Sequence, residues 1–246
     1  MDVVWFIKGV YIDNMCNNTC VDNVCVEDMR VVSLFEAGHT DAWEFLKKLN
    51  NPWDALEMIK KYIGEIGKNL GADEYEKKPN NVWIHKTVKI APSAFIGENI
   101  IIGADTEVRH CAFIRNNAII GKNAVVGNST ELKNVILFDN VQVPHFNYVG
   151  DSILGYKSHF GAGVITSNVK SDHSLVCVKC GNEIIKTNLK KFGAIVGDNV
   201  EIGCNAVLNP GTVIGANATV YPLSMVRGFI PANSIYKKQG EIAEKR

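Results

Sequence analysis

The chain has 246 residues, and its 26 Lys and Arg residues balance 26 Asp and Glu residues, so the formal net charge is zero. This balance excludes the long-range positive field that recruits nucleic acid or an acidic membrane surface, so any anion must be bound by a local cluster. Hydrophobic residues make up 46% of the chain, but no stretch reaches the roughly 18 uninterrupted apolar residues of a membrane-spanning helix. We therefore expect no nucleic-acid partner and no membrane segment.

Residues 1–28 are rich in Asn and Cys and lack a helical period, and Met29 is a natural alternative start. Asp2 stands where a secretory signal has a basic leader. We predict that 1–28 is an irregular extension, loosely attached or misassigned, and that the protein is cytoplasmic. The seven cysteines form no complete zinc tetrad at the usual spacing, so we predict no metal site. They are Cys16, Cys20, Cys25, Cys111, Cys177, Cys180 and Cys204.

Residues 29–79 carry two helical patterns. The segment Thr40–Leu49 has apolar residues at helical spacing after a capping Thr or Asp. The segment Asp54–Asn69 has the same spacing, follows Pro52 and stops before Gly71. We expect this helical region to cover one end or side of the domain that follows.

Between residues 80 and 230 an aliphatic or aromatic residue recurs at every sixth position in two long runs. The first run slips by one residue after Leu132 and loosens around Leu154 and Phe160, and the second run begins at Val196. Small residues often follow four positions later, and glycine often follows directly. The repeating positions are Ile84, Ile90, Ile96, Ile102, Val108, Ile114, Ile120, Val126, Leu132, Leu137, Val143, Val149, Leu154, Phe160, Val196, Ile202, Leu208, Ile214, Val220 and Val226.

A period of six matches neither the 3.6 residues of a helix turn nor a long strand, so each repeat needs a short strand and a turn. Three such units close a triangular coil, in which each inward side chain stacks on the residue 18 positions away. The repeat therefore predicts a mainly β fold, a parallel β-helix with a dry aliphatic core. Its handedness does not follow from the period.

The repeat is interrupted between residues 168 and 191 by a polar stretch, and residues 231–246 fall outside it. Insertions in a β-helix project outward as loops, and loops on a rigid scaffold are where function concentrates. We predict a loop insertion at 168–191 and a C-terminal tail from 231.

Arg115 and Lys133 each follow an inward aliphatic residue and are 18 positions apart. One coil of separation predicts adjacent rungs of one face, about 4.8 Å apart. Stacked cations repel each other, and a phosphate bound between them would turn that repulsion into affinity. The alternative is a solvated face on which Asp151 or Glu131 neutralises the pair, and these residues alone do not decide between the two.

His145 and Tyr148 lie in the segment Val143–Asp151, beside a break in the repeat. Histidine is the side chain best suited to take a proton near neutral pH, although a lone histidine is more often structural. His159, just before Gly161, and Lys191, at the far end of the insertion, are further polar candidates.

The segments 131–134, 143–151 and 161–168 resemble the acetyltransferase domain of the bifunctional bacterial N-acetylglucosamine-1-phosphate uridyltransferase. They also resemble stand-alone hexapeptide proteins that carry the name UDP-N-acetylglucosamine pyrophosphorylase. This resemblance covers roughly residues 80–230. It implies a left-handed β-helix, a homotrimer with sites between neighbouring prisms, and acetyl-CoA as co-substrate.

The resemblance also assigns roles residue by residue. It implies that His145 is the general base and that Arg115 and Lys133 bind a sugar phosphate. It implies substrate contacts for Tyr148 and Lys191.

Three features differ from the family pattern. His159, which we assign to substrate binding, stands where the family has an asparagine. Pro222 falls near a position whose backbone N–H helps to hold the acetyl group in the family, and proline has no N–H. The loop from 169 to 190 is longer than in the family.

We predict an acetyl-CoA-dependent N-acetyltransferase that acts on a hexosamine 1-phosphate in nucleotide-sugar biosynthesis, with His145 as base. The sequence shows no Gly-rich phosphate loop on a large α/β domain, so we do not expect nucleotidyl transfer from it. The alternative function is a non-catalytic protein that binds a nucleotide sugar. Pro222 and His159 favour this alternative, whereas four residues favour the enzyme: Arg115, Lys133, His145 and Tyr148.

Overall fold

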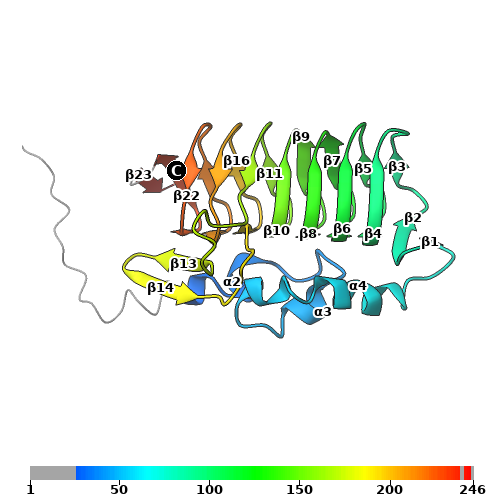
Figure 1. The fold of residues 1–246 in the computed structure, drawn as a ribbon, viewed down its shortest axis with the longest axis horizontal. Helices are drawn as coiled ribbons and strands as arrows, with labels where there is room; N and C mark the ends of the chain where they lie inside the picture. The colour runs from blue at the N-terminus through cyan, green and yellow to red at the C-terminus, as the bar shows by residue number, and fades with distance from the viewer. Residues whose placement is uncertain (1–25, 239–240, 245–246) are drawn as a thin grey trace, which may run out of the picture.

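The computed structural model describes residues 26–238 and 241–244, so most of the predicted extension 1–28 lies outside the described residues. The chain forms a mainly β, left-handed parallel β-helix of about nine turns, as the repeat and the resemblance predicted. Figure 1 shows the strands as successive rungs of one long prism, with short helices along one side.

The prism has three faces, two of which form one 12-stranded sheet because several strands continue around a corner. The first half of β10 pairs with β12, whereas its second half pairs with β15. The open face consists of the first halves of β4 (Phe95–Ile102), β6 (Phe113–Ile120), β8 (Glu131–Leu137) and β10 (Tyr148–Leu154), with β12 (Ile165–Thr166), β17 (Val207–Leu208) and β20 (Met225–Val226).

The other two faces complete each turn. The covered face consists of β2 (Val82–His85), the second halves of β4, β6, β8 and β10, and β15 (Ala194–Val196), β18 (Thr212–Ile214) and β21 (Phe229–Ile230). The back face consists of β3 (Lys89–Ile90), β5 (Glu107–Val108), β7 (Val125–Asn128), β9 (Gln142–His145), β11 (His159–Phe160), β16 (Glu201–Ile202), β19 (Thr219–Val220) and β22 (Ser234–Lys238).

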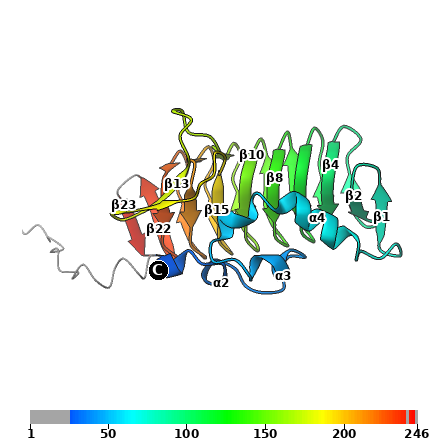
Figure 2. The same ribbon diagram turned by 60° about the horizontal axis from the view of Figure 1, so that its bottom comes forward.

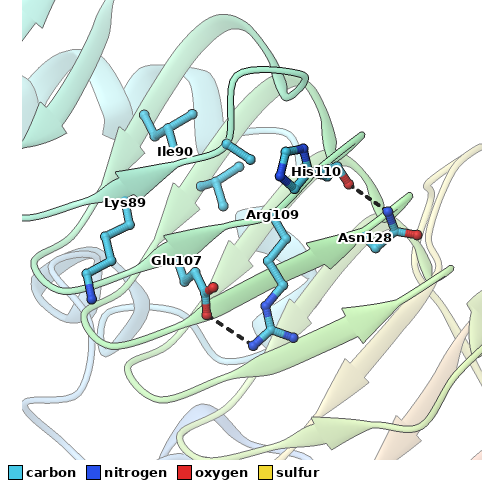
Figure 3. Close-up of a pocket in the computed structure, with 8 residues that line it drawn as sticks. Lys89, Ile90, Glu107, Arg109, His110 and Asn128 are labelled. Carbon is cyan, nitrogen blue, oxygen red and sulfur yellow. Dashed lines mark hydrogen bonds and ion pairs between the residues drawn. The ribbon is translucent and has the colours of Figure 1, made fainter.

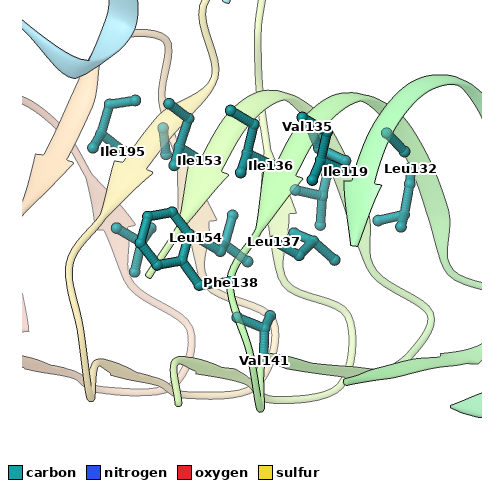
Figure 4. Close-up of a cluster of buried hydrophobic side chains, with 14 of the residues drawn as sticks. Ile119, Leu132, Val135, Ile136, Leu137, Phe138, Val141, Ile153, Leu154 and Ile195 are labelled. Atoms are coloured by element: carbon teal, nitrogen blue, oxygen red, sulfur yellow. The ribbon is translucent and has the colours of Figure 1, made fainter. Parts of the chain in front are cut away.

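The repeating side chains fill the prism as predicted. From Ile102 onward every member of the series is at most 2% exposed, and Ile102, Ile120, Leu137 and Leu154 lie opposite one another on successive strands. Figure 4 shows Leu137 and Leu154 of this row beside a second apolar row of the covered face, which includes Ile119, Ile136, Ile153 and Ile195. Only near the first coil does the core open to solvent, where Ile90 is 38% exposed.

Asparagine occupies many corners because the chain turns there with a positive φ, which Asn tolerates better than most residues. At the corner between the open and covered faces the residues Asn99, Asn117 and Asn134 have φ values of 52°, 52° and 56°. Asp151 continues this column with a φ of 46°. The turn geometry therefore accounts for Asn at this corner, and Asp151 is the one member that brings a charge.

The N-terminal region lies along the covered face (Figure 2). It contains α2 (Val31–Leu34), α3 (Trp43–Leu46), η1 (Pro52–Ala55) and α4 (Ile59–Gly67). The helices are shorter than the segments 40–49 and 54–69 that the apolar spacing indicated. Gly67 allows close approach, because a Cβ there would lie 2.4 Å from the ring of Trp83.

Asp198 ties the N-terminal region to the prism. Its carboxylate accepts hydrogen bonds from the backbone N–H groups of Glu36 and Tyr156, each at 2.7 Å. Burial raises the pKa of Asp198 to about 6, although these two hydrogen bonds act in the opposite direction.

The insertion forms a hairpin of β13 (Cys177–Cys180) and β14 (Glu183–Lys186), in place of the outward loop that we expected. Val176 and Val178 are fully buried because β13 packs against β18 and β21. Gly211 and Gly228 allow this packing: a Cβ at either would lie 2.5 Å from a backbone oxygen of the hairpin.

Both ends of the prism are extended by antiparallel strands. At the first end β1 (Tyr75–Lys78) pairs with β2, and at the other end β22 pairs with β23 (Glu241–Glu244). Because β22 also pairs in parallel with β19, the prism continues past residue 230, where we had predicted a tail.

Among residues 26–238 and 241–244 there is no helix long and apolar enough to cross a membrane. The same residues contain no group of three or more His, Cys, Asp and Glu side chains that could hold a metal. The first three cysteines lie outside the described residues. Free thiols are present at Cys111, Cys177 and Cys204.

Candidate functional site

A cavity of about 510 Å³ lies at the corner between the open and covered faces, where the insertion returns to the prism. It brings together Lys133 from β8 and Lys191 from the end of the insertion, two residues that the sequence analysis assigned to substrate binding. We call it the corner cavity. Its lining residues are Leu56, Glu57, Asn116, Asn117, Lys133, Asn134, Asp151, Leu189, Lys190 and Lys191.

The carboxylate of Asp151 is the centre of the polar contacts around this cavity. Its two oxygens lie 3.0 and 2.9 Å from Nζ of Lys133. Asn134 Nδ2 donates to Oδ1 at 3.0 Å, and Asn168 Nδ2 donates to Oδ2 at 2.5 Å. Asp151 is only 4% exposed, so its charge is balanced by Lys133 and these amide donors rather than by bulk water.

Tyr148 joins this network from the open face. Its hydroxyl accepts a hydrogen bond from Asn168 Nδ2 at 3.2 Å, and Asn168 also donates to Asp151. Burial raises the pKa of the Tyr148 hydroxyl, and the negative charges of Asp151 and Glu131 raise it further. The phenol therefore stays protonated at neutral pH and is able to donate a hydrogen bond.

Arg115 and Lys133 are not stacked as predicted. The register between β6 and β8 shifts after Ile114, so that Lys133 lies opposite Asn116 and Arg115 has no partner residue on β8. This bulge is the structural form of the one-residue slip in the repeat, and bulges re-aim side chains. The guanidinium of Arg115 pairs with Glu131 at 2.9 Å, so each cation has its own carboxylate.

His145 ends β9 at the corner between the back and open faces. Its backbone N–H donates to Asn147 Oδ1 at 3.1 Å, and its carbonyl accepts from the N–H of Gly163 at 3.0 Å. Among the described residues the imidazole makes no hydrogen bond or ion pair. The main chain of His145 is therefore fixed, whereas its exposed ring is available to a ligand.

His159 lies on the back face, away from Lys133 and Tyr148. Its Nδ1 is 2.8 Å from Glu201 Oε2 on the neighbouring strand. The structure thus brings Lys133 and Lys191 together in the corner cavity and links Tyr148 to it through Asn168 and Asp151. Arg115 is not in the lining and pairs with Glu131, the residue opposite Tyr148 on β8. His145 stands at the opposite edge of the open face.

Two further cavities contain none of the predicted site residues. One, of about 460 Å³ on the back face, is lined in part by Lys89, Glu107 and Arg109. Figure 3 shows Arg109 turned toward Glu107, 3.0 Å away, so that its charge is locally balanced. The other, of about 330 Å³, lies between the insertion and the corner at Arg227.

Sequence reasoning assigned no role to Asn134 and Asn168, which contact Asp151, or to Glu57 in the lining of the corner cavity. Asn134 and Asn168 each lie 17 residues from Asp151, so applying the coil spacing to polar corner residues would have found both. Glu57 comes from the N-terminal region and has no periodic relation to the prism, so no pattern in the sequence predicts its position.

Residues 105–239, more than half of the chain, match the GMPPB C-terminal domain family. The bifunctional protein GlmU of Methanococcus maripaludis is 35% identical over 205 residues, which cover 80% of this chain and 49% of that protein. This chain therefore spans about half the length of that curated relative. The uncharacterized acetyltransferase YaiX of Escherichia coli is 27% identical over 76% of this chain and 87% of its own.

Among solved structures, the acetyltransferase domain of PglB from Neisseria gonorrhoeae, in complex with acetyl coenzyme A, is similar at 17% identity with a TM-score of 0.34. That match covers 72% of this chain and 62% of the PglB chain. The family match covers the strands of the open and back faces from β5 to β22, together with the whole insertion. The chain belongs to the GMPPB C-terminal domain family.

Proposed function

We propose that the protein is an acetyl-CoA-dependent N-acetyltransferase that acts on a hexosamine 1-phosphate in nucleotide-sugar biosynthesis of the UDP-N-acetylglucosamine type. The observation that carries this proposal is the corner cavity, which joins Lys133 and Lys191 at the edge of the face that bears Arg115 and Tyr148. The name of the relative YaiX, an uncharacterized acetyltransferase, supports the same reaction class.

The corner cavity suits an anionic sugar. Its lining includes three lysines, Lys133, Lys190 and Lys191, against the two carboxylates of Glu57 and Asp151. This leaves a local excess of positive charge, although the whole chain is neutral. A phosphate is held by such lysines through charge-assisted hydrogen bonds, and Arg115 adds a planar donor nearby.

His145 is the proposed base. The amine of the acceptor must lose a proton as it attacks the thioester carbon, and a neutral imidazole can take that proton. The new C–N bond forms while the C–S bond breaks, and the thiol of coenzyme A leaves with a proton. The free ring of His145 at the edge of the open face fits this role.

Backbone N–H groups near His145 are available for the developing oxyanion. Among the described residues the N–H groups of Ala162 and Cys204 donate no hydrogen bond, and both lie at the corner that also holds His145. Preorganised donors of this kind stabilise the negative oxygen of the transition state. Acetyl-CoA would supply the thioester, and the prism would supply these donors.

We also propose a homotrimer in the cytoplasm. Phe95, Phe113, Ile165 and Met225 lie in register along the open face and are between 39% and 56% exposed. A row of exposed apolar side chains on a flat sheet is suited to self-association. Packing of this face against a second copy would bring the polar edges of two open faces together.

The reaction is tested by incubating the protein with acetyl-CoA and glucosamine 1-phosphate and measuring thiol release. His145→Ala is expected to lower turnover by about 10²–10⁴-fold with little change in affinity for the sugar phosphate. Arg115→Ala and Lys133→Ala are expected mainly to weaken that affinity. His39→Ala, on the N-terminal region, is the matched control and is expected to keep wild-type kinetics.

The second candidate is a non-catalytic protein that binds a nucleotide sugar. Pro222 favours it, because proline has no backbone N–H. Ala162 and Cys204, at the same corner, each have one. The pairing of His159 with Glu201 also favours this candidate, because the side chain that we assigned to substrate binding contacts a carboxylate instead. Thermal stabilisation by nucleotide sugars, without thiol release for any hexosamine 1-phosphate, would establish this candidate and reject the enzyme.

A further inference from the structure

The charge of Asp151 is not required by the fold. Asn99, Asn117 and Asn134 adopt the same positive φ at the same corner in the preceding coils. Amides at this corner pair between neighbouring coils, as where Asn81 Nδ2 donates to Asn99 Oδ1 at 3.2 Å and Asn117 Nδ2 donates to Asn134 Oδ1 at 3.5 Å. An asparagine would therefore satisfy the backbone at position 151, whereas a buried carboxylate costs free energy unless it is paired.

The carboxylate instead organises the side chains of the corner cavity. It binds the ammonium group of Lys133 with both oxygens, which fixes the end of a long and flexible side chain. It also accepts from Asn168, whose amide reaches the Tyr148 hydroxyl. It accepts from Asn134, whose amide also donates to the carbonyl of Leu56 at 3.0 Å.

These contacts join three parts of the molecule that are far apart in the sequence. Lys133 and Tyr148 belong to the prism, Asn168 is the first residue of the insertion, and Leu56 lies in the N-terminal region. Among the described residues, the Asp151 carboxylate is the only group that accepts hydrogen bonds from the side chains of both Lys133 and Asn168.

We propose that Asp151 is a positioning residue: it holds Lys133 and, through Asn168, the Tyr148 hydroxyl in the single arrangement that receives the acceptor. This inference rests on the proposed function for the identity of the acceptor. Asp151 does not itself bind the phosphate, because two anions would repel each other. Its negative charge lowers the affinity for an anionic acceptor, while its hydrogen bonds fix the geometry needed for transfer.

The test replaces Asp151 with Asn, which keeps the size and the positive φ but removes the charge. Asp151→Asn is expected to lower kcat about 10-fold to 100-fold and to leave the KM for glucosamine 1-phosphate unchanged or lower. Loss of geometry slows transfer, whereas loss of a negative charge favours binding of the anion. A merely structural defect would raise KM or reduce the amount of active protein.

Asp198→Asn is the matched control, because Asp198 is also a buried aspartate of the prism, 3% exposed, but lies at another corner. It is expected to change stability while kcat and KM stay within twofold of the wild type. Wild-type kcat in Asp151→Asn, or a raised KM with unchanged kcat, would overturn the proposal.

A second readout does not depend on activity. Because Asp151 contributes to the raised pKa of Tyr148, Asp151→Asn is expected to lower that pKa in a spectrophotometric titration assigned with Tyr148→Phe. Limited labelling with an amine-reactive reagent is expected to modify Lys133 faster in Asp151→Asn than in the wild type.

The two readouts separate failure of this proposal from failure of the proposed function. If the wild type shows no acetyl transfer but both spectroscopic and labelling changes occur, the reaction is wrong and the positioning role stands. If the wild type is active and neither change occurs, Asp151 does not position Lys133 and Tyr148.

Discussion

The covered face and the open face share the strands β4, β6, β8 and β10, yet their outward side chains have opposite environments. On the covered face the outward row is at most 5% exposed from β2 to β18 and ends at the partly buried Phe229; its buried members are Trp83, Ile101, Ile119, Ile136, Ile153, Ile195 and Val213. On the open face the corresponding row contains Phe95, Phe113, Glu131, Tyr148, Ile165, Val207 and Met225, and four of these are at least 39% exposed.

The comparison separates scaffold from site. Inward residues make the prism on every face, but outward residues decide what each face does. Apolar outward residues on the covered face bind the N-terminal region and give the prism a second core. On the open face, Glu131 and Tyr148 interrupt the apolar row. The residues of the candidate site lie at the edges of this face.

The difference between the two faces is tested most strongly by substitutions at two positions of β6. Ile119→Asp buries an unpaired carboxylate on the covered face and is expected to cost at least about 4 kcal/mol or to prevent folding. Phe113→Asp, on the open face, is expected to leave the free energy of unfolding of the monomer nearly unchanged. Urea unfolding of both variants measures this, and equal losses would mean that the two faces are not distinct.

The contribution of the N-terminal region is measured at Trp53. This side chain is 1% exposed and its ring lies 5.9 Å from that of Phe192. Trp53→Ala is expected to lower the free energy of unfolding by about 3–5 kcal/mol, because a large cavity is left between η1 and the prism. Phe95→Ala on the open face is the control. A loss below about 1 kcal/mol for Trp53→Ala would show that the region contributes little to the core.

Asp198 predicts how the covered face responds to pH. A carboxyl group whose pKa rises from 3.8 to about 6 on folding stabilises the fold fully below its unfolded pKa. This contribution, at most about 3 kcal/mol, is lost as the pH rises to about 6. Relative to Asp198→Asn, the wild type should therefore lose stability between pH 4 and pH 6 and not change further above that range. Parallel pH profiles of the two proteins would contradict the assignment.

The smallest effect on folding and the clearest effect on assembly are expected at the open face. Phe113 packs edge-on against Phe95, with ring centroids 5.3 Å apart. Phe113→Asp is expected to change monomer stability by less than about 0.5 kcal/mol, while shifting the mass in light scattering from trimer to monomer. A trimer that persists in this variant would place the interface elsewhere.

The sequence alone predicted the prism, because stacking side chains 18 residues apart is a local rule that repeats in each coil. It also predicted that Lys133, Tyr148 and Lys191 belong to one site, although that assignment came from a resemblance rather than from the period. It indicated helices in the region 29–79 but made them too long, since apolar spacing marks a buried stripe and not the residues at which a helix ends.

Only the tertiary structure decided how the charges are paired. The one-residue slip in the repeat does not show which residue of the neighbouring strand is left unpaired. In the structure the register shifts within β6, so Arg115 does not lie opposite Lys133, and each cation pairs with its own carboxylate. Glu57 and Leu56 reach the corner cavity through packing of the N-terminal region, which no period encodes. Contacts between segments distant in the sequence depend on how whole elements pack, and that information is not contained in any one repeat.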